Sequence, residues 1–132
     1  MRKICVVNQK GGVGKTTTTI NIATGLADRK KRVLILDLDA QGNVGTSLCV
    51  HSETNMYHML VEDAKPEDCI VNVNEYLDVI PSDKSLSHAE LTLNGVASRE
   101  TVLKRAMQDV NNYDYVIIDC PPTINLLNQN AL

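Results

Sequence analysis

The 132-residue chain lacks the features that mark membrane, secreted and metal-stapled proteins. It has no apolar run near the roughly 20 residues that a membrane-spanning helix needs. The apolar stretch at its start is too short for a secretory signal peptide. No C-x-x-C pair or zinc-ribbon spacing occurs among its cysteines, which predicts buried or incidental thiols at Cys5, Cys49, Cys69 and Cys120. We therefore expect a cytoplasmic protein without a disulfide framework.

An excess of positive charge is also missing. The chain has 13 Lys and Arg against 16 Asp and Glu, a formal net charge of −3, so it has no general electrostatic attraction to nucleic acid. The cluster at 29–32 (Arg-Lys-Lys-Arg) lies at a predicted helix end, and we interpret it as solvated charge rather than a DNA patch. The three histidines have no metal-ligand spacing and receive no role.

What is present is the composition of one globular domain. Hydrophobic residues make up 43% and charged residues 22% of the chain, which argues against disorder. The length fits a single domain over 1–132, and there is no repeat or low-complexity segment.

Apolar runs alternate with helical patterns along the chain. Continuous apolar runs are typical of strands buried on both faces of a parallel sheet, and strands that alternate with helices favour an α/β fold with right-handed crossovers. The predicted strands cover 3–8, 32–37, 77–81 and 113–119, and the predicted helices cover 15–29, 82–93 and 98–110, with Ser82 and Asp83 as the cap of the second. A last helical pattern over 124–132 has no stop signal, so we expect a chain truncated at its C-terminus.

A glycine-rich segment lies between the first strand and the first helix. Glycines in this setting turn backbone N–H groups toward phosphate oxygens, and the helix N-terminus adds partial positive charge. Lys15 is expected to reach the β- and γ-phosphates and Thr16 to bind Mg²⁺. The usual G-x-x-x-x-G-K-[ST] pattern is not met because Gln9 replaces its first glycine, and an extra lysine, Lys10, is present. The predicted nucleotide-binding residues are Lys10, Gly11, Gly12, Val13, Gly14, Lys15, Thr16 and Thr17.

Three carboxylates follow the predicted strands. Asp37, Asp39 and Asp119 lie at strand ends, where open α/β sheets bind their ligands. Each alone is equally well explained as a helix cap or turn residue. Beside a phosphate loop, however, buried carboxylates are expected to meet a cation such as hydrated Mg²⁺.

Three motifs together resemble the ParA/Soj family of chromosome and plasmid partition ATPases. The loop K-G-G-V-G-K-T is similar to the deviant Walker A motif of the ParA/MinD group of P-loop NTPases, and Gln9 before it fits ParA/Soj. Residues 37–43 (D-L-D-A-Q-G-N) resemble the family's D-x-D-P-Q-G-N segment, with Ala40 in place of the common proline. Residues 115–122 resemble its Walker B strand. The chain is similar to the N-terminal half of such a protein, which implies a mostly parallel sheet flanked by helices.

The resemblance implies roles for these residues and partners for the protein. Lys10, Lys15 and Asp39 would be catalytic, with Asp39 orienting the attacking water and Lys10 reaching the phosphates of a dimer partner. Thr16, Asp37 and Asp119 would serve Mg²⁺, with ATP as the nucleotide. The family further implies an ATP-dependent homodimer, a ParB/Spo0J-like centromere-binding partner, nonspecific DNA binding through the missing C-terminal half, and nucleoid association of the ATP-bound full-length protein.

Two other functions stay open from the sequence. A MinD-like membrane-associated ATPase would need a C-terminal amphipathic helix, and these residues contain none. A non-hydrolysing nucleotide-binding fragment is the other alternative, because the chain would lack later strands and part of a dimer surface.

Overall fold

One five-stranded sheet forms the centre of the computed structural model, which describes residues 1–7, 14–89 and 102–120. Its strand order is β1 (Arg2–Val6), β5 (Tyr115–Asp119), β2 (Val33–Asp37), β4 (Leu77–Ile80) and β3 (Val71–Asn74). The first four strands are parallel, and only β3 runs antiparallel, against β4. The predicted α/β class with a mostly parallel sheet is confirmed.

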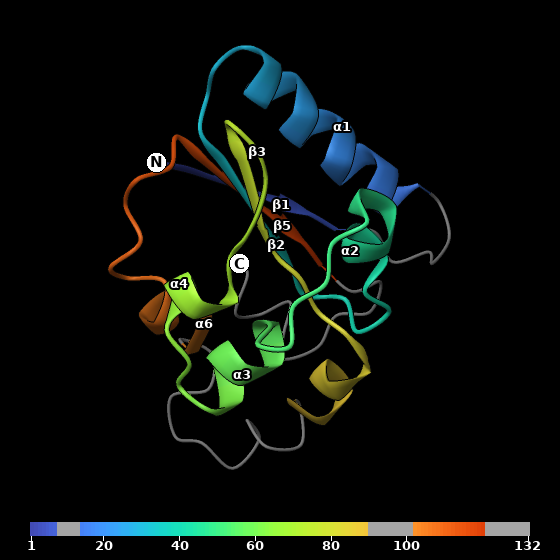
Figure 1. Cartoon of the computed structure of the whole chain (residues 1–132), viewed down its shortest axis with the longest axis vertical. Coiled ribbons are helices and arrows are strands. Elements are labelled where there is room, and N and C mark those ends of the chain that lie inside the picture. The colour runs from blue at the N-terminus through green and yellow to red at the C-terminus, as the bar shows by residue number, and fades with distance from the viewer. Residues whose placement is uncertain (8–13, 90–101, 121–132) are drawn as a thin grey trace.

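Helices flank this sheet on both sides. The longest, α1 (Lys15–Asp28), lies across one face, whereas α3 (Met56–Val61), α4 (Pro66–Cys69) and α6 (Val102–Ala106) lie on the opposite side (Figure 1). The remaining short elements are α2 (Asn43–Leu48) and the 3₁₀-helix η1 (Lys84–His88). None of the helices in the described ranges has both the length and the apolar character needed to cross a membrane.

The central strand β2 contributes to a hydrophobic core on each face of the sheet. All five of its residues are buried. Val33 and Ile35 pack in one apolar cluster with Ala23 of α1, while Leu34 and Leu36 belong to a second cluster on the other face. A continuous apolar run is therefore required here, because alternate side chains enter different hydrophobic layers.

The structure corrects several details of the predicted elements. The first strand is only partly buried rather than buried on both faces, because β1 lies at the edge of the described sheet. The predicted helix over 82–93 contains the 3₁₀-helix η1, and the described part of the predicted helix over 98–110 contains α6. The pattern over 124–132 lies outside the described residues. Four elements were not predicted, namely β3, α2, α3 and α4.

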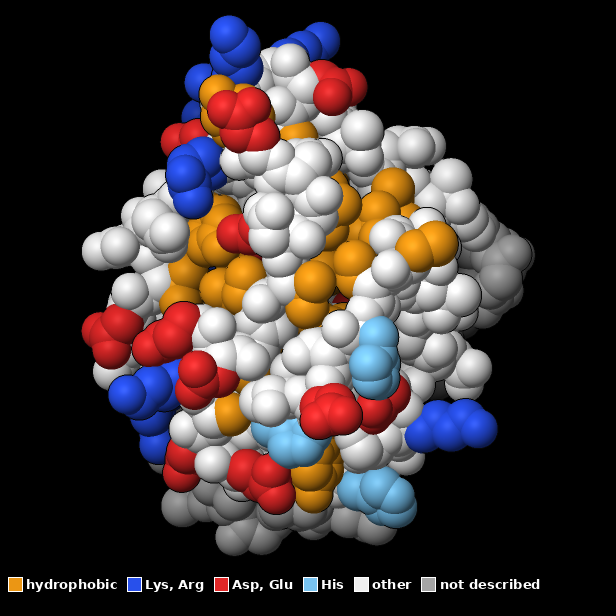
Figure 2. Space-filling model, viewed as in Figure 1, with side chains coloured by type: hydrophobic (Ala, Val, Ile, Leu, Met, Phe, Trp, Pro, Cys, Tyr) orange, Lys and Arg blue, Asp and Glu red, His pale blue; other side chains and the backbone are white. Residues whose placement is uncertain are grey.

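Helix α1 ends without a glycine. Lys30 adopts a left-handed φ of 63°, and its N–H donates to the Ala27 carbonyl while the Lys31 N–H donates to the Leu26 carbonyl. This pair of bonds closes the helix end as a Schellman motif. The predicted solvated cluster at 29–32 is exposed, and Figure 2 shows Lys and Arg gathered where α1 ends, with Asp and Glu among them. Arg32 nevertheless has partners, since its Nε donates to the Asn112 carbonyl.

Candidate functional site

The carboxyl ends of β2 and β5 bring two acidic residues side by side. Asp37 and Asp119 are direct partners in the parallel pairing of these strands, and each side chain is fully buried. Val6 at the end of β1 is the partner of Asp119 on the other side. Helix α1 starts beside the same strand ends, because its first residue, Lys15, contacts Asp119.

Lys15, at the start of α1, lies close to the carboxylates of Asp119 and Asp39. Gly14, with a left-handed φ of 80°, precedes Lys15 as the N-cap of α1. The Lys15 Nζ donates to Asp119 Oδ1 at 2.6 Å and lies 3.5 Å from Asp39 Oδ2. The Lys15 side chain is only 10% exposed, so this ammonium offsets the charge of two nearly buried carboxylates.

Two threonine hydroxyls complete the surroundings of Asp119. The Thr16 hydroxyl donates to Asp119 Oδ2 at 3.2 Å, which places two of the three predicted magnesium residues in contact. The Thr19 hydroxyl is buried, lying 3.3 Å from Asp119 Oδ1 and 3.1 Å from the Lys15 carbonyl. Sequence reasoning missed Thr19. Its signal was its position four residues after Lys15, which puts both side chains on one face of α1.

Asp37 is held differently. Its Oδ1 accepts the backbone N–H of Asp39 at 2.9 Å, whereas Oδ2 is buried without a hydrogen-bond partner in the described structure. Burial raises the pKa of Asp37 to about 7, and the nearby charges of Asp119 and Asp39 add to this rise. A buried carboxylate oxygen that lacks a partner is a group that a cation or a donor would stabilise.

These residues fit a partly hydrated Mg²⁺ rather than an all-protein metal cage. Within the described ranges, no group of three or more His, Cys, Asp or Glu side chains is arranged to hold a metal. Mg²⁺ commonly keeps several waters and uses one or two carboxylates together with substrate phosphates. The Thr16 hydroxyl, the Asp119 carboxylate and the orphan oxygen of Asp37 suit that mode of binding.

The turn after β2 places the third carboxylate. Asp39 is 8% exposed, and its Oδ1 accepts the Gln41 N–H at 3.0 Å. Gly42 closes the turn by donating its N–H to the Asp39 carbonyl. The same carbonyl accepts the Ser82 hydroxyl at 2.5 Å. Sequence reasoning assigned Ser82 only to a helix cap.

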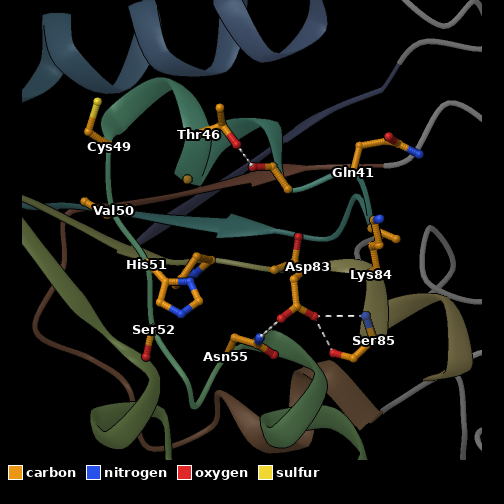
Figure 3. Close-up of a pocket in the computed structure, with 15 residues that line it drawn as sticks. Gln41, Thr46, Cys49, Val50, His51, Ser52, Asn55, Asp83, Lys84 and Ser85 are labelled. Atoms are coloured by element: carbon orange, nitrogen blue, oxygen red, sulfur yellow. Dashed lines mark hydrogen bonds between the residues drawn. The ribbon is translucent and has the colours of Figure 1, made fainter.

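An open cleft of about 680 Å³ adjoins this turn. Figure 3 shows Asp83 on its wall, accepting hydrogen bonds from Asn55 and Ser85. Asn55 also caps α3, together with His58, whose ring Nδ1 accepts the Asn55 backbone N–H at 3.1 Å. His58 therefore has a structural role, which was not predicted from its sequence.

Of the predicted nucleotide-binding residues not yet discussed, the structure describes Thr17. Lys10, Gly11, Gly12 and Val13 lie outside the described residues. Thr17 lies exposed on α1. The four cysteines, all within the described ranges, form no disulfide with one another; Cys69 and Cys120 are buried and Cys49 is exposed.

Gly14 precedes α1, and Lys15 and Thr16 at the helix start contact Asp119 at the end of a parallel strand. This arrangement is typical of α/β proteins that bind phosphate groups. The model of the AAA_31 family, an AAA domain, matches residues 1–132, and the chain belongs to this family.

Individual proteins and solved structures agree with this family assignment. The chain is 49% identical to the sporulation initiation inhibitor protein Soj of Bacillus subtilis over 134 residues, covering 98% of this chain and 53% of Soj. A crystal structure of cobyrinic acid a,c-diamide synthase from Mycobacterium smegmatis with bound ATP analog and magnesium has a TM-score of 0.95 at 38% identity, covering 100% and 56% of the two chains. A putative plasmid partition protein from Borrelia burgdorferi B31 bound to AMPPNP gives a TM-score of 0.89 at 29% identity, covering 98% and 57%.

These similarities confirm the ParA/Soj resemblance and do not favour the MinD-like alternative. The chain spans about half the length of the relatives that it matches. This share agrees with the prediction that it corresponds to an N-terminal half.

Proposed function

We propose that this chain is the phosphate-binding part of a ParA/Soj-type ATPase that binds Mg²⁺ and ATP and serves the partitioning of chromosome or plasmid DNA. Residues 1–132 would form the N-terminal part of a single P-loop domain. The observation that carries the proposal is the position of Lys15, which begins α1 and lies against both Asp119 and Asp39. At the start of α1, Lys15 would contact the nucleotide's phosphates, and the two carboxylates would lie beside the bound metal.

The chain's own residues supply the parts that phosphoryl transfer needs. Lys15 would place its charge on the β- and γ-phosphates, with Gly14 and Thr17 contributing to the nucleotide cradle. Thr16, Asp119 and Asp37 would hold Mg²⁺, which when bound neutralises charge on the phosphate oxygens. Asp39 would orient the attacking water. Positioning and charge neutralisation provide most of the catalysis in this reaction class, so no covalent step on the protein is required.

The remaining parts of the proposal rest on the resemblance to ParA/Soj proteins. Lys10 would reach across an ATP-dependent homodimer, and Gly11, Gly12 and Val13 would complete the phosphate loop. A ParB/Spo0J-like protein would stimulate turnover. DNA would be bound nonspecifically by the second half of a longer protein, giving nucleoid association.

The likeness to a cobyrinic acid a,c-diamide synthase suggests a second candidate activity, because that structure, like the plasmid partition protein, holds a bound ATP analogue. The higher identity to Soj, 49% against 38%, supports partitioning for this chain. ATP-dependent DNA binding by a longer protein that carries this chain distinguishes the two activities.

Calorimetric titration of the purified chain with ATP and Mg²⁺ tests the phosphate site. Lys15→Ala should weaken binding at least about tenfold, a loss of about 1.4 kcal/mol. Lys31→Ala is the control, since Lys31 is exposed beyond α1 and only its backbone is bonded in the described structure. Equal ATP affinity in the parent chain and Lys15→Ala would overturn the assignment.

Sedimentation tests the proposed dimer. A longer protein carrying this chain should dimerise with a nonhydrolysable ATP analogue, while the 132-residue chain alone should show weak or absent turnover.

In the longer protein, Lys10→Ala should lower turnover steeply, since a cation supplied in trans is worth about 10³ to 10⁵ in rate. Partial rescue on mixing inactive Lys10 and Lys15 variants would support action across the dimer. A longer protein that stays monomeric, with Lys10→Ala turning over at the parent rate, would refute it.

A further inference from the structure

The end of β4 contacts the turn that carries Asp39. Strands β2 and β4 are parallel neighbours, paired from Val33 with Leu77 to Leu36 with Ile80. Ser82 follows β4 by two residues, at the same edge of the sheet as Asp39, and it is only 8% exposed. The Ser82 hydroxyl donates to the Asp39 backbone carbonyl at 2.5 Å, across 43 residues of sequence.

A second contact holds the two segments against each other. Gly42 has a left-handed φ of 66°, and a Cβ atom on it would lie 2.8 Å from the Ser82 carbonyl oxygen. No side chain fits between the turn and Ser82, so their backbones approach as closely as glycine permits. The Gly42 N–H also donates to the Asp39 carbonyl at 3.0 Å. This carbonyl therefore accepts one bond from within the turn and one from Ser82.

The Ser82 hydroxyl is not needed to cap the helix that follows it. The cap of η1 is Asp83, whose Oδ1 accepts the Ser85 N–H at 2.9 Å. A serine hydroxyl has one proton to donate. The Ser82 hydroxyl donates to the Asp39 carbonyl and also lies close enough to Asp37 to offset part of the rise that burial causes in the pKa of its carboxyl, so its contacts support a role in positioning the segment from the end of β2 into the turn.

The anchored turn sets the direction of the Asp39 carboxylate. One carboxylate oxygen accepts the Gln41 N–H from within the turn, and the other lies 3.5 Å from Lys15 Nζ. The Asp39 N–H is bonded to Asp37. Among the described residues, every bond of Asp39 other than that to Ser82 comes from its own turn or from the proposed phosphate site.

We propose that Ser82 is a positioning residue for hydrolysis, and that its hydroxyl holds the backbone of Asp39 so that the carboxylate faces the attacking water. This inference rests on the proposed ATPase function. A carboxylate displaced by a fraction of an ångström still permits nucleotide binding, because the proposed phosphate-binding residues 10–17 lie in a different segment of the chain. It orients water poorly, because a misplacement of about 1 Å can cost on the order of 10²-fold in rate.

The test uses a longer protein carrying this chain, with steady-state ATP turnover and nucleotide affinity measured separately. Ser82→Ala should lower kcat about tenfold, as expected for a barrier increase of about 1.4 kcal/mol, with the ATP Kd within about twofold of the parent. Ser82→Thr keeps the hydroxyl and should recover most of kcat. Ser52→Ala is the matched control, because Ser52 lines the same cleft but donates to a different backbone carbonyl, that of Thr54.

Amide hydrogen exchange gives a readout that does not depend on activity. Ser82→Ala should speed exchange at the amides of Gln41 and Gly42, and Ser52→Ala should leave them unchanged. A kcat unaffected in Ser82→Ala, or lost equally in Ser82→Ala and Ser82→Thr while both remain folded, would overturn the positioning role alone. A parent protein that neither binds nor hydrolyses ATP would overturn the proposed function, and this inference with it.

Discussion

Lys15 and Asp119 are 104 residues apart in sequence and meet at 2.6 Å between the start of α1 and the end of β5. The Asp119 side chain is fully buried, and that of Lys15 nearly so. Such a pair stabilises a fold only when other donors satisfy the carboxylate, and here Thr16 and Thr19 do so. The same lysine thus serves the fold and the proposed phosphate site.

This double role predicts that Lys15→Ala destabilises the protein without nucleotide. The substitution leaves a buried carboxylate without its cation, which costs on the order of 3 kcal/mol. Adding Asp119→Asn to it removes the charge that was left unpaired, so the double variant should regain part of the lost stability. Urea unfolding of both variants and the parent measures this. Equal stability of Lys15→Ala and the parent would show that the pair contributes nothing.

Asp39→Ala should separate binding from hydrolysis in a longer protein carrying this chain. The water loses its orienting carboxylate, whereas the proposed phosphate-binding residues 10–17 are unchanged. We expect ATP affinity close to that of the parent and a kcat lower by about 10² or more. Asp28→Ala, at the exposed end of α1, is the control. Normal hydrolysis by Asp39→Ala would move the catalytic role to another residue.

Two adjacent threonines of α1, Thr18 and Thr19, offer an internal comparison. Thr19 is buried with its hydroxyl near Asp119, whereas Thr18 is exposed. Thr19→Val keeps the shape but removes the hydroxyl, so it should cost about 1 to 3 kcal/mol of stability through the weakened solvation of Asp119. Thr18→Val should change stability by less than about 0.5 kcal/mol. Thermal unfolding of the two variants checks the difference, and equal midpoints would remove Thr19 from the site.

The part of the fold that was predicted from sequence is the part with strong local patterns. Buried parallel strands such as β2 need continuous apolar runs, and a glycine loop followed by a helix has few other uses. Lys15, Thr16 and Asp119 could therefore be grouped before the structure was known. Their contacts in the structure agree with that grouping.

What was missed has no local pattern. Elements α2, α3, α4 and β3 have six residues or fewer, too short to show a periodicity. Thr19 and Ser82 are ordinary residues until the sheet places Asp119 and Asp39 beside them. Ser82 also precedes a true cap, Asp83, which made a capping role the natural interpretation of its sequence.

Two glycines should respond to alanine in opposite directions. Gly42 has a φ of 66°, and a Cβ atom there would lie 2.8 Å from the Ser82 carbonyl oxygen, a backbone atom that cannot turn aside. Gly42→Ala should therefore destabilise the protein by about 1 to 3 kcal/mol. Gly25 lies within α1, and a Cβ atom there would meet nothing within 4 Å.

Because alanine is the better helix former, Gly25→Ala should stabilise the protein by about 0.5 to 1 kcal/mol. The comparison uses one chemical change at both positions, so a general effect of the added methyl group cancels. Urea unfolding midpoints with unchanged slopes measure the two shifts. A Gly42→Ala protein as stable as the parent would mean that the turn after β2 does not pack against Ser82 as closely as the structure describes. The anchoring of Asp39 would then lose one of its two supports, and only the Ser82 hydrogen bond would remain.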